Sequence, residues 1–340
     1  MTSRVGVNKS AFTPTQITSV RFVEMKAERS VFDKMGGIFR LSLGHRFRAL
    51  RLSRHEFTGL YFSLPAVVYL AIFSILPIGF SIYLAFTADV PDQRVDRVFS
   101  GIKNFEEVIT NERFHDAAIQ TFEFASLSTI LHVTLGLGIA LLFNQALDRR
   151  FLSIARSFFL LPWAVSPVVV GIIFRLVYSS QFSFISILLG EIKSGLVWQP
   201  LSSTKTALIA VILANVWHFT PYFSINILAG LQGISQALYE AAKVDGASTF
   251  QSFRHITLPS VKRLLLTIAF FDFVVSSIYF DLIWVLTQGG PVWASEVIVT
   301  HIYRKAFQQY SMGYAAAAGL LLFVLLMILT AVVVREMEKE

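Results

Sequence analysis

The sequence predicts an all-α integral membrane protein with six transmembrane helices. Hydrophobic residues make up 54% of the 340 residues and charged residues only 15%, against about 25% charged in typical soluble domains. The apolar residues are gathered into runs long enough for membrane-spanning helices, each of which needs about 20 residues. A chain of this composition must bury most of its residues in lipid or against other membrane helices.

Six apolar runs define the predicted spans. In chain order they are residues 61–87, 124–147, 157–178, 206–231, 264–286 and 311–334. The first contains two prolines and no charge, the third ends with Arg175, and the fourth contains Pro221. The fifth is interrupted by Asp272 and Asp281. These interruptions indicate places where a span kinks or faces protein instead of lipid.

The charges between the spans predict that both chain ends face the cytoplasm. Residues 1–58 carry eleven Lys and Arg against four Asp and Glu, and basic flanks are retained on the cytoplasmic side. The connections 147–156 and 232–263 are also basic, whereas 88–118 holds seven acidic against four basic residues and 179–205 is nearly uncharged. Arg304 and Lys305, in the last outer connection, go against this rule.

The predicted organisation is therefore a basic cytoplasmic tail, residues 1–58, followed by a six-helix domain, residues 59–335. Residues 35–57 mix apolar side chains with five arginines. This segment is either a helix lying in the inner membrane interface or a disordered basic tail that only fixes the orientation.

The sequence lacks the motifs of an enzyme or a metal site. It has no cysteine, which excludes disulfides, thiol catalysis and cysteine-ligated metals. It also lacks the phosphate-binding G-x-x-x-x-G-K-[ST], the zinc motif H-E-x-x-H and the nucleophile motif G-x-S-x-G. We therefore expect no catalytic residue, no metal and no cofactor in this chain, and an energy source outside it.

Polar residues inside two spans fall on helical stripes. The fourth span carries Asn215, His218, Tyr222 and Asn226, and the fifth carries Asp272, Ser276 and Tyr279. Spacings of three and four place each set on one helix face. Polar groups in a membrane are costly unless they face protein or water. The stripes indicate either a polar pathway, for example for a sugar, or interhelical hydrogen bonding, and Asp272 could alternatively couple protons.

A compact charged segment, "YEAAKVDGASTFQSFRHITLP", separates these two spans at residues 239–259. Residues 238–244 favour a helix, which Gly246 can end in the left-handed conformation. Ser248 or Thr249 can cap a second helix, expected to end at Leu258-Pro259. Charge, small alanines and a glycine in this order predict a loop, residues 237–260, that docks on another protein.

Residues 240–259, "EAAKVDGASTFQSFRHITLP", resemble the cytoplasmic EAA loop of binding-protein-dependent ABC importer permeases, with E-A-A, D-G-A and I-x-L-P in register. Three further stretches resemble the carbohydrate branch of that family, the maltose- and glycerol-phosphate-type permeases. They are "FSGIKNFEEVI", "ARSFFLLPWAVSPVVVGIIFRLVY" and "FDLIWVLTQGGP". The resemblance covers about residues 58–335 and leaves out the tail.

This resemblance implies a type I ABC importer permease fold in the bacterial inner membrane. It implies a second homologous permease, two cytoplasmic ATPase subunits that bind ATP and Mg²⁺, and an extracytoplasmic solute-binding protein. The chain itself would be a transport subunit and not an enzyme. The residues it implies for ATPase docking are Glu240, Ala241, Ala242, Asp245, Gly246, Leu258 and Pro259.

In the maltose-type member, sugar contacts come from stretches that correspond to residues 218–222 and 275–279. Tyr222 matches that pattern, whereas His218, Phe219, Ser276 and Tyr279 depart from it. The expected pathway residues are Asn215, His218, Phe219, Tyr222, Asn226, Asp272, Val275, Ser276 and Tyr279. The departures leave open whether the solute is a neutral, phosphorylated or sulfonated sugar or polyol.

Two functions of other classes remain as alternatives. A stand-alone secondary transporter would use Asp272 for proton coupling. A membrane scaffold or channel would have no substrate of its own. The match to the EAA loop favours the importer permease over both.

Overall fold

The computed structural model describes residues 54–88, 98–145, 148–179 and 199–338, most of them in helices. Within these ranges no strand is present, and Thr87 and Phe99 form one isolated bridge. The chain divides into two compact units, residues 1–69 and 70–340. The expected tail, residues 1–58, and its possible interfacial helix lie outside the described residues except for 54–58, which belong to the first described helix.

The first predicted span, residues 61–87, is helical up to Ala85. It comprises α2 (Arg54–Leu70), the π-helical turn η1 (Ala71–Ile75) and α3 (Leu76–Ala85). Residues Tyr61–Ala85 are long and apolar enough to cross a membrane. Pro77 lies in the first turn of α3, immediately after the wider π-helical turn. A proline that lacks an N–H is tolerated at such a position.

Three further spans are confirmed as long apolar helices: α5 (Glu112–Phe143), α9 (Ala207–Gln232) and α15 (Met312–Met337). α5 begins well before the predicted residue 124, because its first turns are polar and do not show in an apolar run. Asn111 caps it by accepting a hydrogen bond from the Phe114 N–H at 3.2 Å. A short 3₁₀ turn, η2 (Pro200–Ser202), precedes α9.

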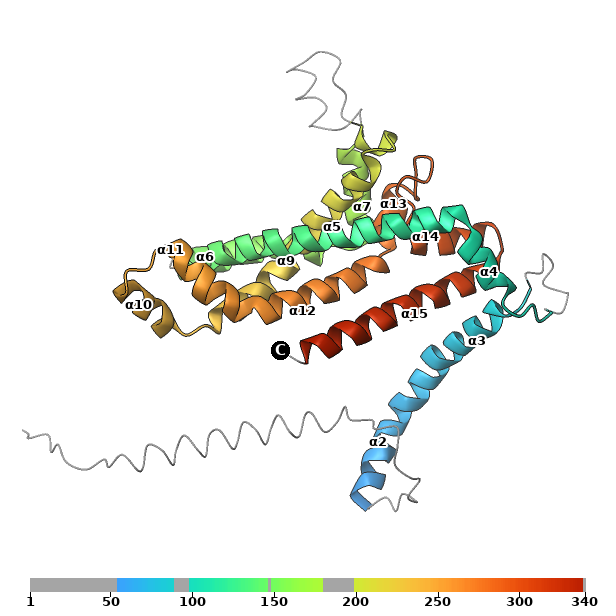
Figure 1. The fold of residues 1–340 in the computed structure, drawn as a ribbon, viewed down its shortest axis with the longest axis horizontal. Coiled ribbons are helices and arrows are strands. Elements are labelled where there is room, and N and C mark those ends of the chain that lie inside the picture. The colour runs from blue at the N-terminus through green and yellow to red at the C-terminus, as the bar shows by residue number, and fades with distance from the viewer. Residues whose placement is uncertain (1–53, 89–97, 146–147, 180–198, 339–340) are drawn as a thin grey trace, which may run out of the picture. The chain divides into compact units, whose positions relative to one another are not determined.

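α5 and α9 pack side by side along much of their length, which Figure 1 shows. Small residues on α5 allow the close approach that membrane helices use to associate. A methyl group added at Gly136 would lie 3.2 Å from Phe223 Cβ and 3.3 Å from Ile227 Cδ1. The close packing of α5 and α9 therefore requires glycine, whose side chain is a single hydrogen atom, at position 136.

The third predicted span, residues 157–178, is not one straight helix, and this corrects the sequence prediction. It consists of α6 (Arg149–Ala164) and α7 (Pro167–Val177), which are bent by 92°. Val165 and Ser166 are non-helical, with ψ of 140° and 138°. The cause is Pro167, because a residue that precedes proline is driven out of the helical region.

The fifth predicted span, residues 264–286, is divided as well. α12 (Leu258–Ser277) ends, residues 278–280 leave the helix, and α13 (Asp281–Leu286) follows and packs on α7. The predicted helix end at Leu258-Pro259 is also wrong. α11 (Thr249–Ser252) continues through the π-helical turn η3 (Phe253–Thr257) into α12, where Pro259 occupies the first turn and needs no hydrogen-bond donor.

Four described helices are long and apolar enough to span a membrane, or five if the bent α6–α7 pair is one span. α12 is not counted among these apolar helices, because its 20 residues include three charged ones, Lys262, Arg263 and Asp272. The described helices thus define a multi-span protein, and the count of six spans stays a prediction.

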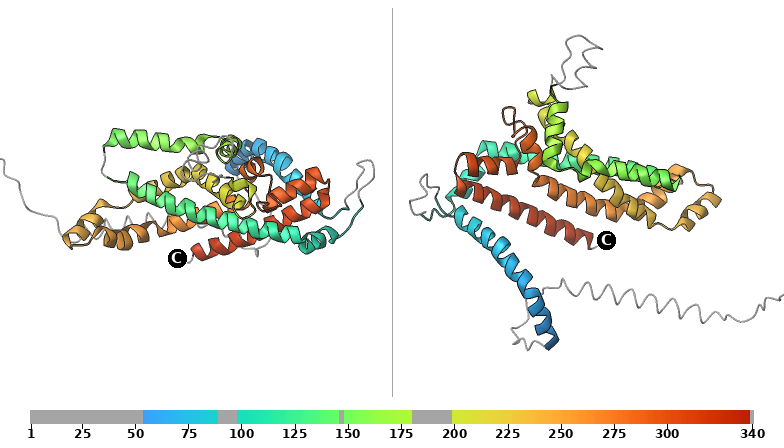
Figure 2. Two further views of the ribbon diagram at one scale, coloured as in Figure 1. Left: turned by 90° about the horizontal axis from the view of Figure 1, so that it is seen from above. Right: turned by 180° about the vertical axis from the view of Figure 1, so that it is seen from behind.

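Two groups of short helices and connections lie at opposite ends of the helix bundle (Figures 1 and 2). α10 (Gln236–Val244), α11 and the start of α6 lie at one end. α4 (Lys103–Thr110), α14 (Ile298–Tyr303) and the π-helical turn η4 (Arg304–Gln308) lie at the other. Two connections predicted from their basic charge to be cytoplasmic, 147–156 and 232–263, therefore share one end. α3 and α4 both pack against α15.

The close approach of α5 and α9 makes a testable prediction. Gly136→Leu should destabilise the protein by about 1–3 kcal/mol, because the added side chain overpacks the interface with Phe223 and Ile227. The measurement is thermal unfolding of the purified chain in detergent. Gly138→Leu is the matched control, since a Cβ at Gly138 meets nothing within 4 Å. Equal melting temperatures for the two variants would contradict the packing argument.

Candidate functional site

A hydrogen-bonded pair of ionisable side chains joins α5 to α12. His132 Nδ1 lies 2.8 Å from Asp272 Oδ2, and the two side chains are only 1% and 5% exposed. The second oxygen of Asp272, Oδ1, accepts a hydrogen bond from Ser276 Oγ at 3.3 Å. Both carboxylate oxygens therefore have partners inside the protein, which is what burial at membrane depth requires of a charged group.

α9 completes the surroundings of His132. The ring Nε2 lies 3.4 Å from the main-chain oxygen of Asn215. The ring also stacks on Phe223, with centroids 4.9 Å apart and planes 16° from parallel. The orientation of His132 is thus set by contacts to two other helices. The set of sites predicted from sequence did not include His132, although a histidine inside a predicted span is itself a signal of function or of interhelical bonding.

His218, on α9, reaches the break between α6 and α7. Its Nε2 donates a hydrogen bond to the Val165 carbonyl at 2.9 Å. Val165 is non-helical, so the ordinary helical hydrogen bonding is interrupted there. An unpaired backbone carbonyl at membrane depth would cost several kcal/mol. His218 therefore satisfies a backbone group that the bend exposes.

The remaining predicted pathway residues are partly exposed. They are Phe219, Tyr222, Asn226, Val275 and Tyr279. Tyr222 stacks on Trp163 of α6, with centroids 5.4 Å apart, and the Asn226 amide donates to the Tyr222 carbonyl at 2.7 Å. Phe219 meets Tyr279 edge-on at 5.5 Å. Tyr279 follows the end of α12, and its buried hydroxyl has no hydrogen-bond partner within the described part of the chain.

The structure thus separates the nine predicted residues into two groups. Asn215, His218, Asp272 and Ser276 are buried, and their side-chain or main-chain atoms take part in the contacts among α5, α6, α9 and α12 described above. The other five, which are three aromatic residues, an asparagine and a valine, are partly exposed. Stacking rings beside hydrogen-bonding groups suit a hydroxyl-rich solute.

The predicted docking loop folds as two helices joined by a tight turn. Gly246 has φ +77°, the left-handed conformation expected for the residue after a helix end. The Ala247 N–H bonds to the Ala242 carbonyl at 2.8 Å, and the Gly246 N–H bonds to the Lys243 carbonyl at 3.1 Å. This pair of bonds is the Schellman motif. Ser248 then begins α11 through a capping box with Gln251.

The surface of this loop is open to a partner. No residue of α10 is buried, and Glu240 and Ala241 are exposed. Three apolar side chains are exposed as well, Leu238 at 50%, Val244 at 87% and Phe250 at 69%. Within the loop, α10 is tied to the helix that continues into α12 by a 2.9 Å hydrogen bond between the hydroxyls of Tyr239 and Thr257. Exposed large apolar side chains among charged ones, on a fixed support, are compatible with a protein contact.

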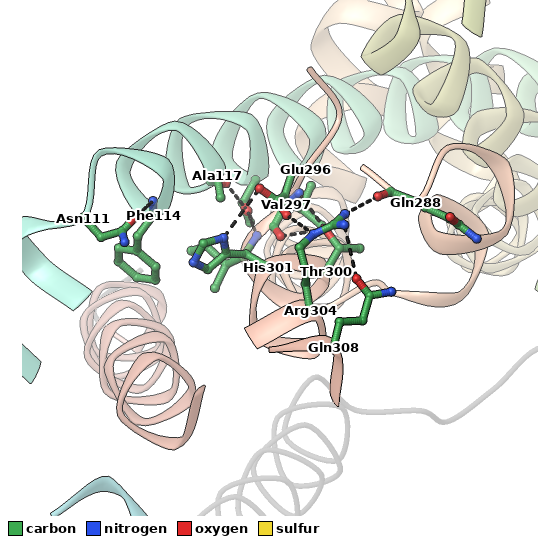
Figure 3. A network of polar contacts seen from close by, with 12 residues as sticks. Asn111, Phe114, Ala117, Gln288, Glu296, Val297, Thr300, His301, Arg304 and Gln308 are labelled. Carbon is green, nitrogen blue, oxygen red and sulfur yellow. Dashed lines mark hydrogen bonds and ion pairs between the residues drawn. The ribbon is translucent and has the colours of Figure 1, made fainter. Parts of the chain in front are cut away.

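A second polar cluster lies at the opposite end of the bundle (Figure 3). Arg304 donates from Nε to Glu296 Oε1 at 2.9 Å and from Nη2 to the Gln288 carbonyl at 2.5 Å. Its guanidinium also lies 4.2 Å from the centroid of the Trp293 ring. Gln288 and Trp293 have positive φ, 52° and 65°. Arg304 therefore holds a connection whose backbone is strained.

Glu296 is the charged partner of this cluster. Its side chain is 3% exposed, and His301 Nδ1 lies 3.5 Å from Oε2, an ion-pair distance and not a good hydrogen bond. Burial alone would raise the pKa of the Glu296 carboxyl. The neighbouring His301 ring and Arg304 guanidinium outweigh burial, so the pKa lies below the ordinary value of 4.5.

Comparison with known families defines the class of protein. Residues 132–339 match the model of the family described as binding-protein-dependent transport system inner membrane component. This match covers most of the chain, including α9, the docking loop and α12. The chain belongs to this family, and the resemblance to ABC importer permeases is confirmed.

Named relatives extend the similarity towards the N-terminus. The trehalose/maltose transport system permease protein MalF of Thermococcus litoralis is 34% identical, over 79% of this chain and 90% of its own length. The sn-glycerol-3-phosphate transport system permease protein UgpA of Agrobacterium fabrum is 32% identical, over 71% of this chain and 82% of its own length.

A solved structure supports the fold. A chain in the crystal structure of a bacterial ABC transporter involved in the import of the acidic polysaccharide alginate superposes with a TM-score of 0.73 at 23% identity. The superposition covers 84% of this chain and 96% of that one. The arrangement of helices described above is therefore that of an ABC importer permease.

The His132–Asp272 pair predicts strong coupling between two spans. Asp272→Leu and His132→Leu should each destabilise the protein by roughly 3–5 kcal/mol, because each leaves its partner buried without a counterpart. The double variant should cost less than the sum of the two. Denaturant unfolding in mixed micelles measures this, and the exposed Asp281→Asn is the control. Additive effects would show that the pair is not coupled.

Glu296 predicts an acid-sensitive connection between α13 and α14. Because its folded-state pKa is lowered below 4.5, its stabilising contribution is complete above pH 4.5 and is lost as the pH falls through the lowered pKa. Glu296→Gln should lower the free energy of unfolding by about 1.5–3 kcal/mol at neutral pH. In thermal unfolding measured against pH, its melting temperature should fall less steeply at acid pH than that of the wild type. The exposed Glu106→Gln serves as control. An equally steep fall in Glu296→Gln would refute this assignment.

Proposed function

We propose that this chain is the permease subunit of an ATP-driven, binding-protein-dependent ABC importer for a carbohydrate or a related polyol derivative. The observation that carries the proposal is family membership together with curated relatives of about one-third identity whose names state transport of trehalose, maltose or glycerol phosphate. In this role the chain transports and does not hydrolyse ATP. It lies in the bacterial inner membrane with six spans and both ends in the cytoplasm.

The proposed partners follow from the same family. A second homologous permease forms the other half of the translocation pathway, and an extracytoplasmic solute-binding protein delivers the solute. A chain that resembles this one also occurs in a structure of the alginate transporter with its periplasmic protein. Two cytoplasmic ATPase subunits bind ATP and Mg²⁺, since no phosphate-binding loop is present in this sequence.

The docking loop is the proposed site of energy coupling. The Glu240–Asp245 face would seat in the ATPase, with Ala241 and Ala242 permitting close approach and Gly246 fixing the turn. Three features favour rigid transmission: the Schellman motif, the capping box and the Tyr239–Thr257 hydrogen bond. Leu258 and Pro259 then lead directly into α12. A displacement of the loop would therefore move the α11–α12 helix as a body.

The solute pathway is proposed to pass along the partly exposed residues of α9 and α12. Phe219, Tyr222 and Tyr279 would stack on sugar rings, and Asn226 would bond hydroxyls, with Val275 beside them. Asn215, His218, Asp272 and Ser276 would support these residues from behind. The alternative of a proton-coupled transporter is not favoured, because both oxygens of the Asp272 carboxylate are engaged inside the bundle.

The coupling role of the loop predicts an uncoupled variant. Glu240→Lys should abolish co-purification with the ATPase and reduce solute uptake at least about tenfold, since reversing one charge at a docking contact costs more than about 1.4 kcal/mol. Membrane insertion should be unchanged, because Glu240 is exposed.

Glu106→Lys is the control for this experiment, because it makes the same charge reversal at an exposed site on α4, at the other end of the bundle. Co-purification and uptake are measured for both variants. If Glu240→Lys retains both properties, the loop does not dock the ATPase.

A further inference from the structure

A groove of about 660 Å³ lies between α6 and α9, near the end of the bundle that carries α10. Its polar lining comes from Ser153 and Arg156, early in α6, and Gln232, the last residue of α9. Its apolar lining includes Leu160 and Ile225. Leu160 is about 10 Å along α6 from Ser153, at 1.5 Å per residue. The groove is therefore polar near the helix ends and apolar deeper in the bundle.

Arg156 is held in the groove, and no described residue supplies it with a counter-charge. Its Nη2 donates to the Phe143 carbonyl at 2.7 Å, and the guanidinium lies 6.0 Å from the centroid of the Phe143 ring. Its Nε is buried and has no hydrogen-bond partner among the residues that the structure describes. None of the ion pairs formed by those residues involves Arg156. The guanidinium is thus fixed on one side, lines the groove and keeps one donor unsatisfied.

The donors around the groove favour an anion. The nearest carboxylate in sequence, Asp148, is occupied by capping α6, where it accepts from the Arg150 and Phe151 N–H groups at 2.9 and 3.0 Å. Ser157 uses its hydroxyl proton on the Ser153 carbonyl, which leaves the Ser153 hydroxyl and the Gln232 amide as neutral donors. A guanidinium with two neutral donors is a typical arrangement for a phosphate group.

The apolar residues of the groove show what kind of phosphate fits. A free ion in the groove would rest on Leu160 and Ile225, whereas a lipid would place its headgroup at Arg156 and its acyl chain along this apolar floor. The face of α6 that carries Phe151, Ile154, Phe158 and Leu161, none of which lines the groove, is 55–69% exposed, as expected of a helix in contact with lipid. Basic pockets between membrane helices are known to bind anionic lipid headgroups.

We propose that the groove between α6 and α9 binds the phosphate of an anionic membrane lipid, with Arg156 as the charged ligand and Ser153 and Gln232 as neutral ones. In the orientation proposed above, this lipid belongs to the cytoplasmic leaflet. Because Arg156 also holds the Phe143 carbonyl, at the end of α5, the bound lipid would fasten α5, α6 and α9 together where the docking loop begins. Binding to the folded state alone would stabilise it.

The test compares lipids on the purified full-length chain in detergent. Phosphatidylglycerol should raise the melting temperature relative to phosphatidylcholine, and native mass spectrometry should show it retained. Arg156→Gln should weaken its binding at least about tenfold, the effect expected on losing a charge-assisted hydrogen bond. Arg150→Gln, which removes a positive charge from the same helix outside the groove, should leave binding unchanged.

A second variant keeps the proposal testable if Arg156→Gln folds poorly. Ser153→Glu places a carboxylate in the groove and retains the Arg156 contact to Phe143. It should abolish the rise in melting temperature caused by phosphatidylglycerol, while the melting temperature in phosphatidylcholine should change little. An undiminished response to phosphatidylglycerol in Arg156→Gln or, where that variant fails to fold, in Ser153→Glu would overturn the proposal.

Inorganic phosphate in lipid-free detergent forms a separate arm. It should not stabilise the wild type. Stabilisation by inorganic phosphate that depends on Arg156 would overturn the lipid assignment in favour of a free phosphate or a phosphorylated solute. None of these measurements uses transport, so their outcome is independent of the proposed importer function.

Discussion

The described bundle depends on a contact between two ionisable side chains in its interior, His132 on α5 and Asp272 on α12. A charged or polar group at membrane depth must find its partner within the protein, so this pair fixes how both helices are rotated. α9 lies against both and contributes the Asn215 carbonyl and the Phe223 ring. The small residue Gly136, one turn from His132 on α5, lets α9 approach closely enough for these contacts.

The same constraint governs the backbone at the bent span. Pro167 drives Ser166 out of the helical conformation, Val165 before it is also non-helical, and the carbonyl of Val165 accepts a hydrogen bond from His218. A polar side chain on one span thus permits a break in another. The position of His218 on α9 and the bend in α6–α7 are one structural arrangement, and it places Trp163 against Tyr222, where the proposed pathway passes.

Sequence reasoning predicts spans well because apolar length is a local property. Residues 61–87, 206–231 and 311–334 agree with helices in the structure to within a few residues. The breaks at 165–166 and 278–280 were missed, although Pro167 marks the first, because whether a break is tolerated depends on neighbours such as His218. Helical spacing correctly places Asp272 and Ser276 on one face. It cannot show that Asp272 faces His132, which is 140 residues away.

The buried pair also limits how the proposed importer can move. The α11–α12 helix runs without interruption from the docking loop to Asp272, so a displacement of the loop reaches the pair directly. Separating a buried pair of this kind would cost roughly 3–5 kcal/mol, a large share of the total stability of a typical domain. If α5 and α12 move together as one body, the contact between His132 and Asp272 is not broken. Alternating access would therefore keep His132 and Asp272 joined and place the sliding surface elsewhere.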